Sequence, residues 1–299
     1  MTKASTYIAS VIFTLLLIFL MVGAAAAGVL RYCALDTDTA LKIVESQELA
    51  SRVQSALKTT VRQQESTTGI PASVYEAAIS EEQLNTIIRD TVTNGFAYLR
   101  GDTASLGVQP DFSVLETDIR TFFEEYAAEQ NLKLDEKLEE AIRSTTDAAE
   151  QNILSACDVF RFGTLNEAGV IKSAKVYVPW AGVAALAMFV AVFVVAMLLF
   201  LINFHARGEG FYWCATAALI ASLLVLIPSF WLQHTRWFDR FAVKTDQTYA
   251  AVTSFLYANT GALIRTAIGG IIAAAVLYAI FALIRFRRHQ REVVRKAKH

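Results

Sequence analysis

The sequence of 299 residues contains few of the side chains that metal centres and hydrolytic active sites require. Its four histidines are His205, His234, His289 and His299, so the long polar segment 31–177 has none. That absence excludes a Cys/His zinc site and a histidine general base from the segment. No calcium-loop spacing, phosphate-binding glycine loop or nucleophile elbow is present. We therefore predict a non-enzymatic protein with no catalytic residues, no cofactor and no metal ligands.

Charge is scarce in four long apolar blocks, 7–30, 178–202, 211–232 and 261–284. Each is long enough to cross a hydrocarbon core about 30 Å thick, which takes roughly 20 apolar residues. The second and third blocks hold no Asp, Glu, Lys, Arg or His, and in the fourth Arg265 lies near one end. The blocks predict four transmembrane helices, and the lack of buried ionisable groups argues against proton coupling.

The blocks predict an all-α protein with a helical extracytoplasmic domain inserted between the first and second spans. The predicted segments are the first span 1–30, the extracytoplasmic domain 31–177, the second span 178–202, a cytoplasmic loop 203–210, the third span 211–232, an outer interfacial helix or loop 233–260, the fourth span 261–284 and a cytoplasmic tail 285–299.

The orientation follows from the basic tail, because short cytoplasmic segments are enriched in Lys and Arg. The tail has seven basic residues against the single acid Glu292. These are Arg285, Arg287, Arg288, Arg291, Arg295, Lys296 and Lys298. We predict that both termini are cytoplasmic and that the seven residues contact anionic lipid headgroups. Nucleic acid is not an expected partner of so short a tail. Arg236, Arg240 and Lys244, between the third and fourth spans, are an argument for the opposite orientation.

Segment 32–176 carries 24 acidic against 13 basic residues, so it should favour cationic or neutral partners. Its acidic pairs, such as Glu124 with Glu125, are interpreted as charge on helix surfaces.

Cysteine is also scarce, with three residues in all. Cys214 lies in the third span, where a buried thiol is an ordinary packing residue. Cys33 and Cys157 both lie in the predicted exported segment, so a disulfide between them and a pair of free thiols are both compatible with the sequence. The first span is longer than the apolar region of a signal peptide, which favours an uncleaved anchor over a cleaved leader.

The exported segment has helical periodicity and local capping signals. A helix from about residue 41 should end at Gly69 and Pro71. Ser80 with Gln83, and Ser113 with Glu116, predict capping boxes at the starts of two further helices, and a last helix should span about 134–162. Gly101 lies between Arg100 and Asp102, at the position where a helix commonly ends in a left-handed glycine. This Arg-Gly-Asp tripeptide is therefore interpreted as a helix C-terminus and not as a receptor motif.

Small residues in the apolar blocks and an amphipathic stretch between two of them allow two further predictions. The run 23–28 and the pair Gly269 and Gly270 predict close helix packing. The stretch 236–258 alternates aromatic and charged residues, which predicts an interfacial helix along the outer leaflet.

The stretches around Ile70 and Pro71, around Tyr98, Leu99 and Gly101, and around Asp111, Ser113 and Leu115 resemble a segment of uncharacterised multi-pass membrane proteins of Gram-positive bacteria. The resemblance covers about 50 residues. It implies a bacterial cell membrane and no particular activity.

Two non-enzymatic functions are compatible with these features, and a membrane hydrolase that uses carboxylates of the exported segment is a third hypothesis. The first is a membrane protein whose extracytoplasmic helical domain binds or senses something outside, or serves as an accessory subunit of an envelope complex with a membrane or envelope protein partner. The alternative is a channel or transporter component, although the sequence shows no internal repeat or broken span to support it.

Overall fold

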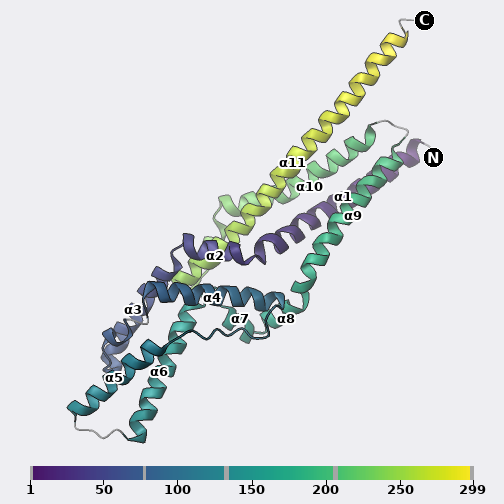
Figure 1. The fold of residues 1–299 in the computed structure, drawn as a ribbon. Helices are drawn as coiled ribbons and strands as arrows, with labels where there is room; N and C mark the ends of the chain where they lie inside the picture. Colours follow the sequence, from purple (N-terminus) through teal and green to yellow (C-terminus); the bar gives the residue numbers. More distant parts are fainter. Residues whose placement is uncertain (1–2, 77–78, 131–134, 205–207, 297–299) are drawn as a thin grey trace. The chain divides into compact units, whose positions relative to one another are not determined.

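The structure, a computed structural model, describes residues 3–76, 79–130, 135–204 and 208–296, without the side chains of 291–296. Every regular element in these ranges is a helix (Figure 1). The α-helices are α1 (Lys3–Val29), α2 (Thr37–Ser46), α3 (Leu49–Thr68), α4 (Glu81–Arg100), α5 (Ser113–Glu129), α6 (Glu136–Cys157), α7 (Phe162–Glu167), α8 (Val170–Tyr177), α9 (Ala181–Ile202), α10 (Glu209–His234) and α11 (Asp246–Lys296). A π-helical turn, η1 (Leu30–Ala34), follows α1, and 3-10 turns form η2 (Ala72–Tyr75), η3 (Val178–Trp180) and η4 (Trp237–Arg240).

The chain divides into two compact units. The first comprises Met1–Leu35, Pro179–Arg240 and Leu256–His299 and is called the span unit below. The second comprises Asp36–Val178 and Phe241–Phe255 and is called the helical domain.

Four helical stretches are long and apolar enough to cross a membrane. They are Ala4–Ala34, Val170–Ile202, Glu209–His234 and Asp246–Gln290, and each contains one of the four predicted spans. Large apolar side chains on their outer faces, such as Phe19 and Phe193, are more than 70% exposed. Acyl chains would cover such faces without the free-energy cost that water imposes.

Inside the span unit, α1 packs against α9 and α10 (Figure 1). Leu17, Leu199 and Ala217 are almost completely buried in this packing. The predicted close packing through glycine occurs between α10 and α11, where a Cβ on Gly270 would lie 2.2 Å from Ser222 Oγ. Gly270 therefore permits a contact that alanine would prevent.

The helical domain has one continuous apolar core. Leu49 and Val53 of α3, Leu84 and Ile88 of α4 and Leu115 of α5 are among its buried residues. These residues recur at helical spacing, so each helix turns one apolar stripe toward its neighbours.

Three of the predicted helix ends are confirmed. Ser80 Oγ accepts a hydrogen bond from Gln83 N at 3.4 Å at the start of α4. Gly101 has φ +83° at the end of α4, the left-handed conformation that glycine adopts most easily. Gly69 ends α3 in the same way, with φ +73°.

The predicted capping box at Ser113 is wrong. Ser113 is already the first residue of α5, and its N–H donates to Asp111 Oδ1 at 2.9 Å. Asp111 is thus the side chain that satisfies this helix start. The hydrogen bond from Ser113 also lowers the pKa of Asp111.

The predicted helix over 134–162 is two helices. α6 ends at Cys157, and Asp158 then accepts hydrogen bonds from Phe162 N at 2.8 Å and Gly163 N at 2.7 Å. Those two amides would otherwise lack partners at the start of α7. The carboxylate of Asp158 therefore favours a new helix over an extension of α6.

The predicted helix after the first span is also divided, because Glu48 has φ +49° between α2 and α3.

The predicted interfacial helix over 236–258 does not form as a separate element. Only η4 forms there before α11 begins at Asp246, and α11 then continues without a break through the predicted fourth span to Lys296. No proline or glycine occurs between Asp246 and Asn259, so nothing in the local sequence ends the helix there. Residues 246–255 of α11 belong to the helical domain, where Ala250 and Ala251 lie in its core.

Candidate functional site

Cys33 and Cys157, for which the sequence is compatible with either a disulfide or two free thiols, are free thiols in the structure. Cys157 is completely buried in the core of the helical domain, and burial raises the pKa of its thiol to about 12. Cys33 lies in η1 of the span unit and is partly exposed. A thiol with so high a pKa is not a nucleophile at neutral pH, which makes Cys157 a packing residue.

The tail residues predicted to contact lipid headgroups lie on the last turns of α11 or beyond it. Arg285, Arg287 and Arg288 are exposed side chains. The side chains of Arg291, Arg295 and Lys296, and all of Lys298, lie outside the described residues.

The Arg-Gly-Asp tripeptide forms a local ion pair. Arg100 Nε lies 2.8 Å from Asp102 Oδ2, and Arg100 Nη1 donates to Thr37 Oγ1 at 2.9 Å. The charged groups of the tripeptide contact each other and α2, which suits a structural role at the end of α4.

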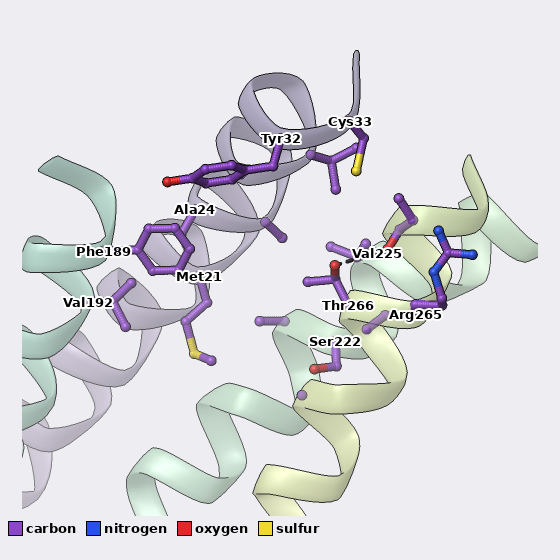
Figure 2. A pocket seen from close by; sticks show the side chains of 17 residues that line it. Met21, Ala24, Tyr32, Cys33, Phe189, Val192, Ser222, Val225, Arg265 and Thr266 are labelled. Atoms are coloured by element: carbon purple, nitrogen blue, oxygen red, sulfur yellow. Dashed lines mark hydrogen bonds between the residues drawn. The ribbon is translucent and has the colours of Figure 1, made fainter. Parts of the chain in front are cut away.

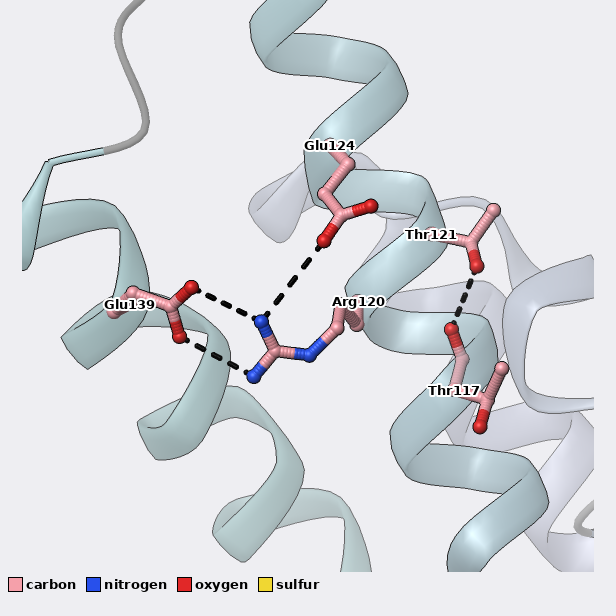
Figure 3. Close-up of polar contacts among 5 residues, drawn as sticks. All are labelled: Thr117, Arg120, Thr121, Glu124 and Glu139. Atoms are coloured by element: carbon pink, nitrogen blue, oxygen red, sulfur yellow. Dashed lines mark hydrogen bonds and ion pairs between the residues drawn. The ribbon is translucent and has the colours of Figure 1, made fainter.

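An open polar cleft of about 1190 Å³ lies along α5 and α6 of the helical domain. Arg120 of α5 bridges it, donating from Nη1 to Glu139 Oε1 at 3.0 Å and from Nη2 to Glu139 Oε2 at 3.2 Å (Figure 3). Glu124 lies 3.9 Å from the same guanidinium. The pairing is bidentate, a geometry that orients two helices relative to each other.

Of the other carboxylates of the cleft, Glu116, Glu136, Glu140 and Asp147 are exposed helix-surface groups, and Glu150 is half-buried. Within the part of the chain that the structure describes, no three His, Cys, Asp or Glu side chains are placed to hold a metal ion together.

A smaller cavity of about 370 Å³ in the helical domain is lined without charged side chains. Apolar groups from Leu57 and Ile153 alternate with the polar groups of Gln64, Tyr75 and Asn152. Its volume is in the range of small-molecule sites, about 300–1,000 Å³. Such a lining suits an uncharged ligand.

An apolar cavity of the span unit lies among α1, α9, α10 and α11 and has a volume of about 450 Å³ (Figure 2). Apolar groups dominate its lining, including those of Met21, Ala25, Phe189 and Val225. The small residues of the run 23–28 contribute here, because Ala24, Ala25 and Gly28 leave space where larger side chains would fill it.

Polar groups line one part of this span-unit cavity. Arg265 and Thr266 of α11 and Ser222 of α10 are among its lining residues (Figure 2). Thr266 Oγ1 already donates to Ala262 O at 2.9 Å. Arg265 is exposed and forms no ion pair or hydrogen bond with any residue the structure describes. The cavity thus combines apolar walls with one unpaired cation.

The span unit contains a buried polar contact that was not predicted from the sequence. Asn203 Nδ2 donates to Ser10 Oγ and to Leu199 O, both at 2.9 Å. Both side chains are buried, with exposures of 4% for Asn203 and 0% for Ser10. The signal was present in the sequence, since Ser10 is a polar residue inside the first apolar block.

Comparison with protein-family models, curated proteins and solved structures gives no match.

Proposed function

We propose that the protein is a non-enzymatic integral membrane protein in which the helical domain lies outside a bacterial cell membrane and binds a ligand or a partner of the envelope. The four candidate spans anchor it, and the basic tail lies in the cytoplasm.

The observation that carries this proposal is the continuity of α11. The helix has 51 residues, which at 1.5 Å per residue is a length of about 75 Å, more than twice the thickness of a hydrocarbon core. Its first turns are core residues of the helical domain, and its later turns form the fourth candidate span. A single helix therefore has enough residues for a domain contact, a membrane crossing and the start of the tail.

The contacts at the start of α11 are numerous enough to couple it to the helical domain. Ala251 is completely buried, and the Phe255 ring lies 5.6 Å from that of Phe160 and 6.0 Å from that of Phe96. Arg52 Nη1 lies 2.6 Å from Asp246 Oδ2. A ligand that changes the packing of this core would act directly on α11, which is the physical basis of the proposed sensing role.

The neutral cavity of the helical domain gives this function a place for a small ligand. Leu57, Tyr75 and Ile153 line it, and Leu57 and Ile153 also belong to the core that holds the start of α11.

A channel or transporter component is the second candidate. The observation that favours it is the span-unit cavity with its unpaired Arg265, since a cation inside an apolar span often marks a substrate path. Ser10 and Asn203 add a buried polar contact to the same unit.

In-cell photo-cross-linking followed by purification in mild detergent tests the proposal. A photoreactive residue at exposed Thr121 or Glu125 of α5 samples the helical domain, and one at Leu224, 54% exposed on α10, is the matched control in a span. We expect a reproducible adduct of fixed stoichiometry from the α5 positions and none of that mass from Leu224. Recovery of the protein without an α5 adduct, together with solute flux into vesicles that contain it, would reject the proposal in favour of transport.

A further inference from the structure

We propose that the span-unit cavity is a binding site for one anionic phospholipid, whose acyl chain occupies the apolar part and whose phosphate pairs with Arg265. The site is independent of the function proposed for the helical domain.

The unpaired guanidinium is the first argument. Arg265 lies within the candidate span Asp246–Gln290, and no carboxylate among the described residues pairs with it. A charge in an apolar segment is costly unless it reaches water, a headgroup or a counter-ion. A phosphate diester carries the matching charge, and its two free oxygens fit the parallel N–H groups of a guanidinium.

The shape and lining of the cavity are the second argument. Its volume of about 450 Å³ falls in the range of sites that enclose a small ligand. The walls near Met21, Phe189 and Val192 present only carbon and sulfur atoms. That surface suits an acyl chain and would exclude a free inorganic anion.

The third argument is an unused hydroxyl. Ser222 is buried, with 6% exposure, and lines the cavity. Its Oγ forms no hydrogen bond within the described part of the chain, whereas Thr266 on α11 donates to a backbone carbonyl. The hydroxyl lines the cavity and has a proton to donate, and the ester oxygens of a lipid would supply an acceptor near the apolar part of the site.

Lipid retention by the purified full-length protein tests this site. Native mass spectrometry of protein released from micelles that contain equal amounts of phosphatidylglycerol and phosphatidylcholine would count the retained molecules of each. We expect one retained lipid, with phosphatidylglycerol favoured at least fivefold. Arg265→Gln should reduce this preference to about one, and Arg240→Gln, also exposed and basic but outside the cavity, should leave it unchanged.

A matched pair on α1 tests the cavity itself. Ala25 lines the cavity, whereas its neighbour Ala26 is exposed and does not. Ala25→Phe should abolish retention of both lipids, while Ala26→Phe should retain lipid as the unmodified protein does. Excess inorganic phosphate should not displace the retained lipid from the unmodified protein.

Three results would overturn the proposal. They are equal retention of the two lipids by the unmodified protein, an undiminished preference in Arg265→Gln, and equal retention by the Ala25→Phe and Ala26→Phe variants. The Arg265→Gln result stands even if Ala25→Phe fails to fold, since Arg265 is an exposed side chain.

Discussion

At the residue scale, Gly95 of α4 is a position of the helical domain that has no room for a side chain. A Cβ at Gly95 would lie 2.5 Å from two ring carbons of Phe162. Phe162 is 5% exposed and packs edge-on against Phe96 at 5.4 Å, so the ring has little room to move. We expect Gly95→Ala to destabilise the domain by about 1–3 kcal/mol, the usual cost of overpacking. Thermal unfolding of the purified protein would measure the change.

The control for this substitution is Gly107→Ala. No atom lies within 4 Å of a Cβ placed at Gly107, and its φ is not in the left-handed region. The change should therefore be within about 0.5 kcal/mol of neutral. Equal effects of the two substitutions would show that the contact with Phe162 is not the cause.

A second residue-scale prediction concerns pH. Partial burial, and then the charges of Glu116 and Asp147, raise the pKa of Glu150 above its ordinary 4.5. The folded state holds this proton more tightly than the unfolded state. The stability that protonated Glu150 contributes to the folded state is therefore fully present below pH 4.5 and is lost as the pH rises through the raised pKa. Glu150→Gln should therefore raise the melting temperature at pH 7 and leave it unchanged at pH 4.

Melting curves of the two proteins at both pH values would check this, with Glu125→Gln, an exposed change on α5, as the control. A gain from Glu150→Gln of the same size at pH 4 would mean that charge is not responsible.

The residue scale also shows what sequence alone can predict. Ser80 and Gly101 act through neighbours three or four positions away, so local patterns identify them. The capping box predicted at Ser113 was wrong because Asp111, two residues earlier, offers a competing acceptor for the same helix start. The close packing at Gly95 could not be predicted from a local pattern, since the ring that it contacts, Phe162, lies 67 positions later in the chain.

At the element scale, α11 determines how the helical domain is linked to a span. Phe255 is partly exposed, and its ring packs against Phe96 and Phe160. Phe255→Ala should cost about 2 kcal/mol, less than the 3–5 kcal/mol of a fully buried phenylalanine. Limited proteolysis should then cut segment 241–255 faster, because the start of α11 would leave the core more often.

Phe286→Ala is the matched control on the same helix, since Phe286 is 59% exposed and belongs to the span unit. We expect its proteolysis rate to equal that of the unmodified protein. If both substitutions accelerate cleavage at 241–255 equally, the aromatic contacts are not what holds the start of α11.

The candidate spans can be predicted from the sequence, whereas the packing of the start of α11 cannot. Composition over 20 residues predicts a membrane crossing, and each predicted span falls on a helix long and apolar enough to cross a membrane. The amphipathic stretch before the fourth span looked like a separate helix because aromatic and charged residues alternate in it. Whether such a stretch faces a membrane surface or a protein core depends on contacts with Phe96 and Phe160, which no local pattern contains.

The cavity in the span unit could not be predicted from the sequence either. Small residues such as Ala25, Gly28 and Gly270 predict close approach of helices, and Gly270 indeed contacts Ser222. The same kind of residue also lines the cavity, as at Ala25 and Gly28, although Phe189 Cζ of α9 would lie 3.7 Å from a Cβ placed at Gly28. Only the helix positions distinguish packing from a cavity.

At the scale of the whole molecule, the function depends on which side of the membrane holds the helical domain. Labelling of the native cysteines is a poor test, because Cys157 is completely buried with its pKa raised to about 12. Introduced cysteines at Glu65, exposed on α3, and at Gln290, exposed near the end of α11, avoid this difficulty in a Cys33→Ala background.

A membrane-impermeant maleimide should label Glu65→Cys in intact cells and Gln290→Cys only after the cells are opened. The reason is that seven basic residues in the tail outweigh the three between the third and fourth spans, so the tail should remain inside. The Cys33→Ala protein without an introduced cysteine measures labelling of the two buried thiols. The reverse pattern would place the helical domain in the cytoplasm, where its neutral cavity would meet cytoplasmic ligands and the seven basic residues would lie outside.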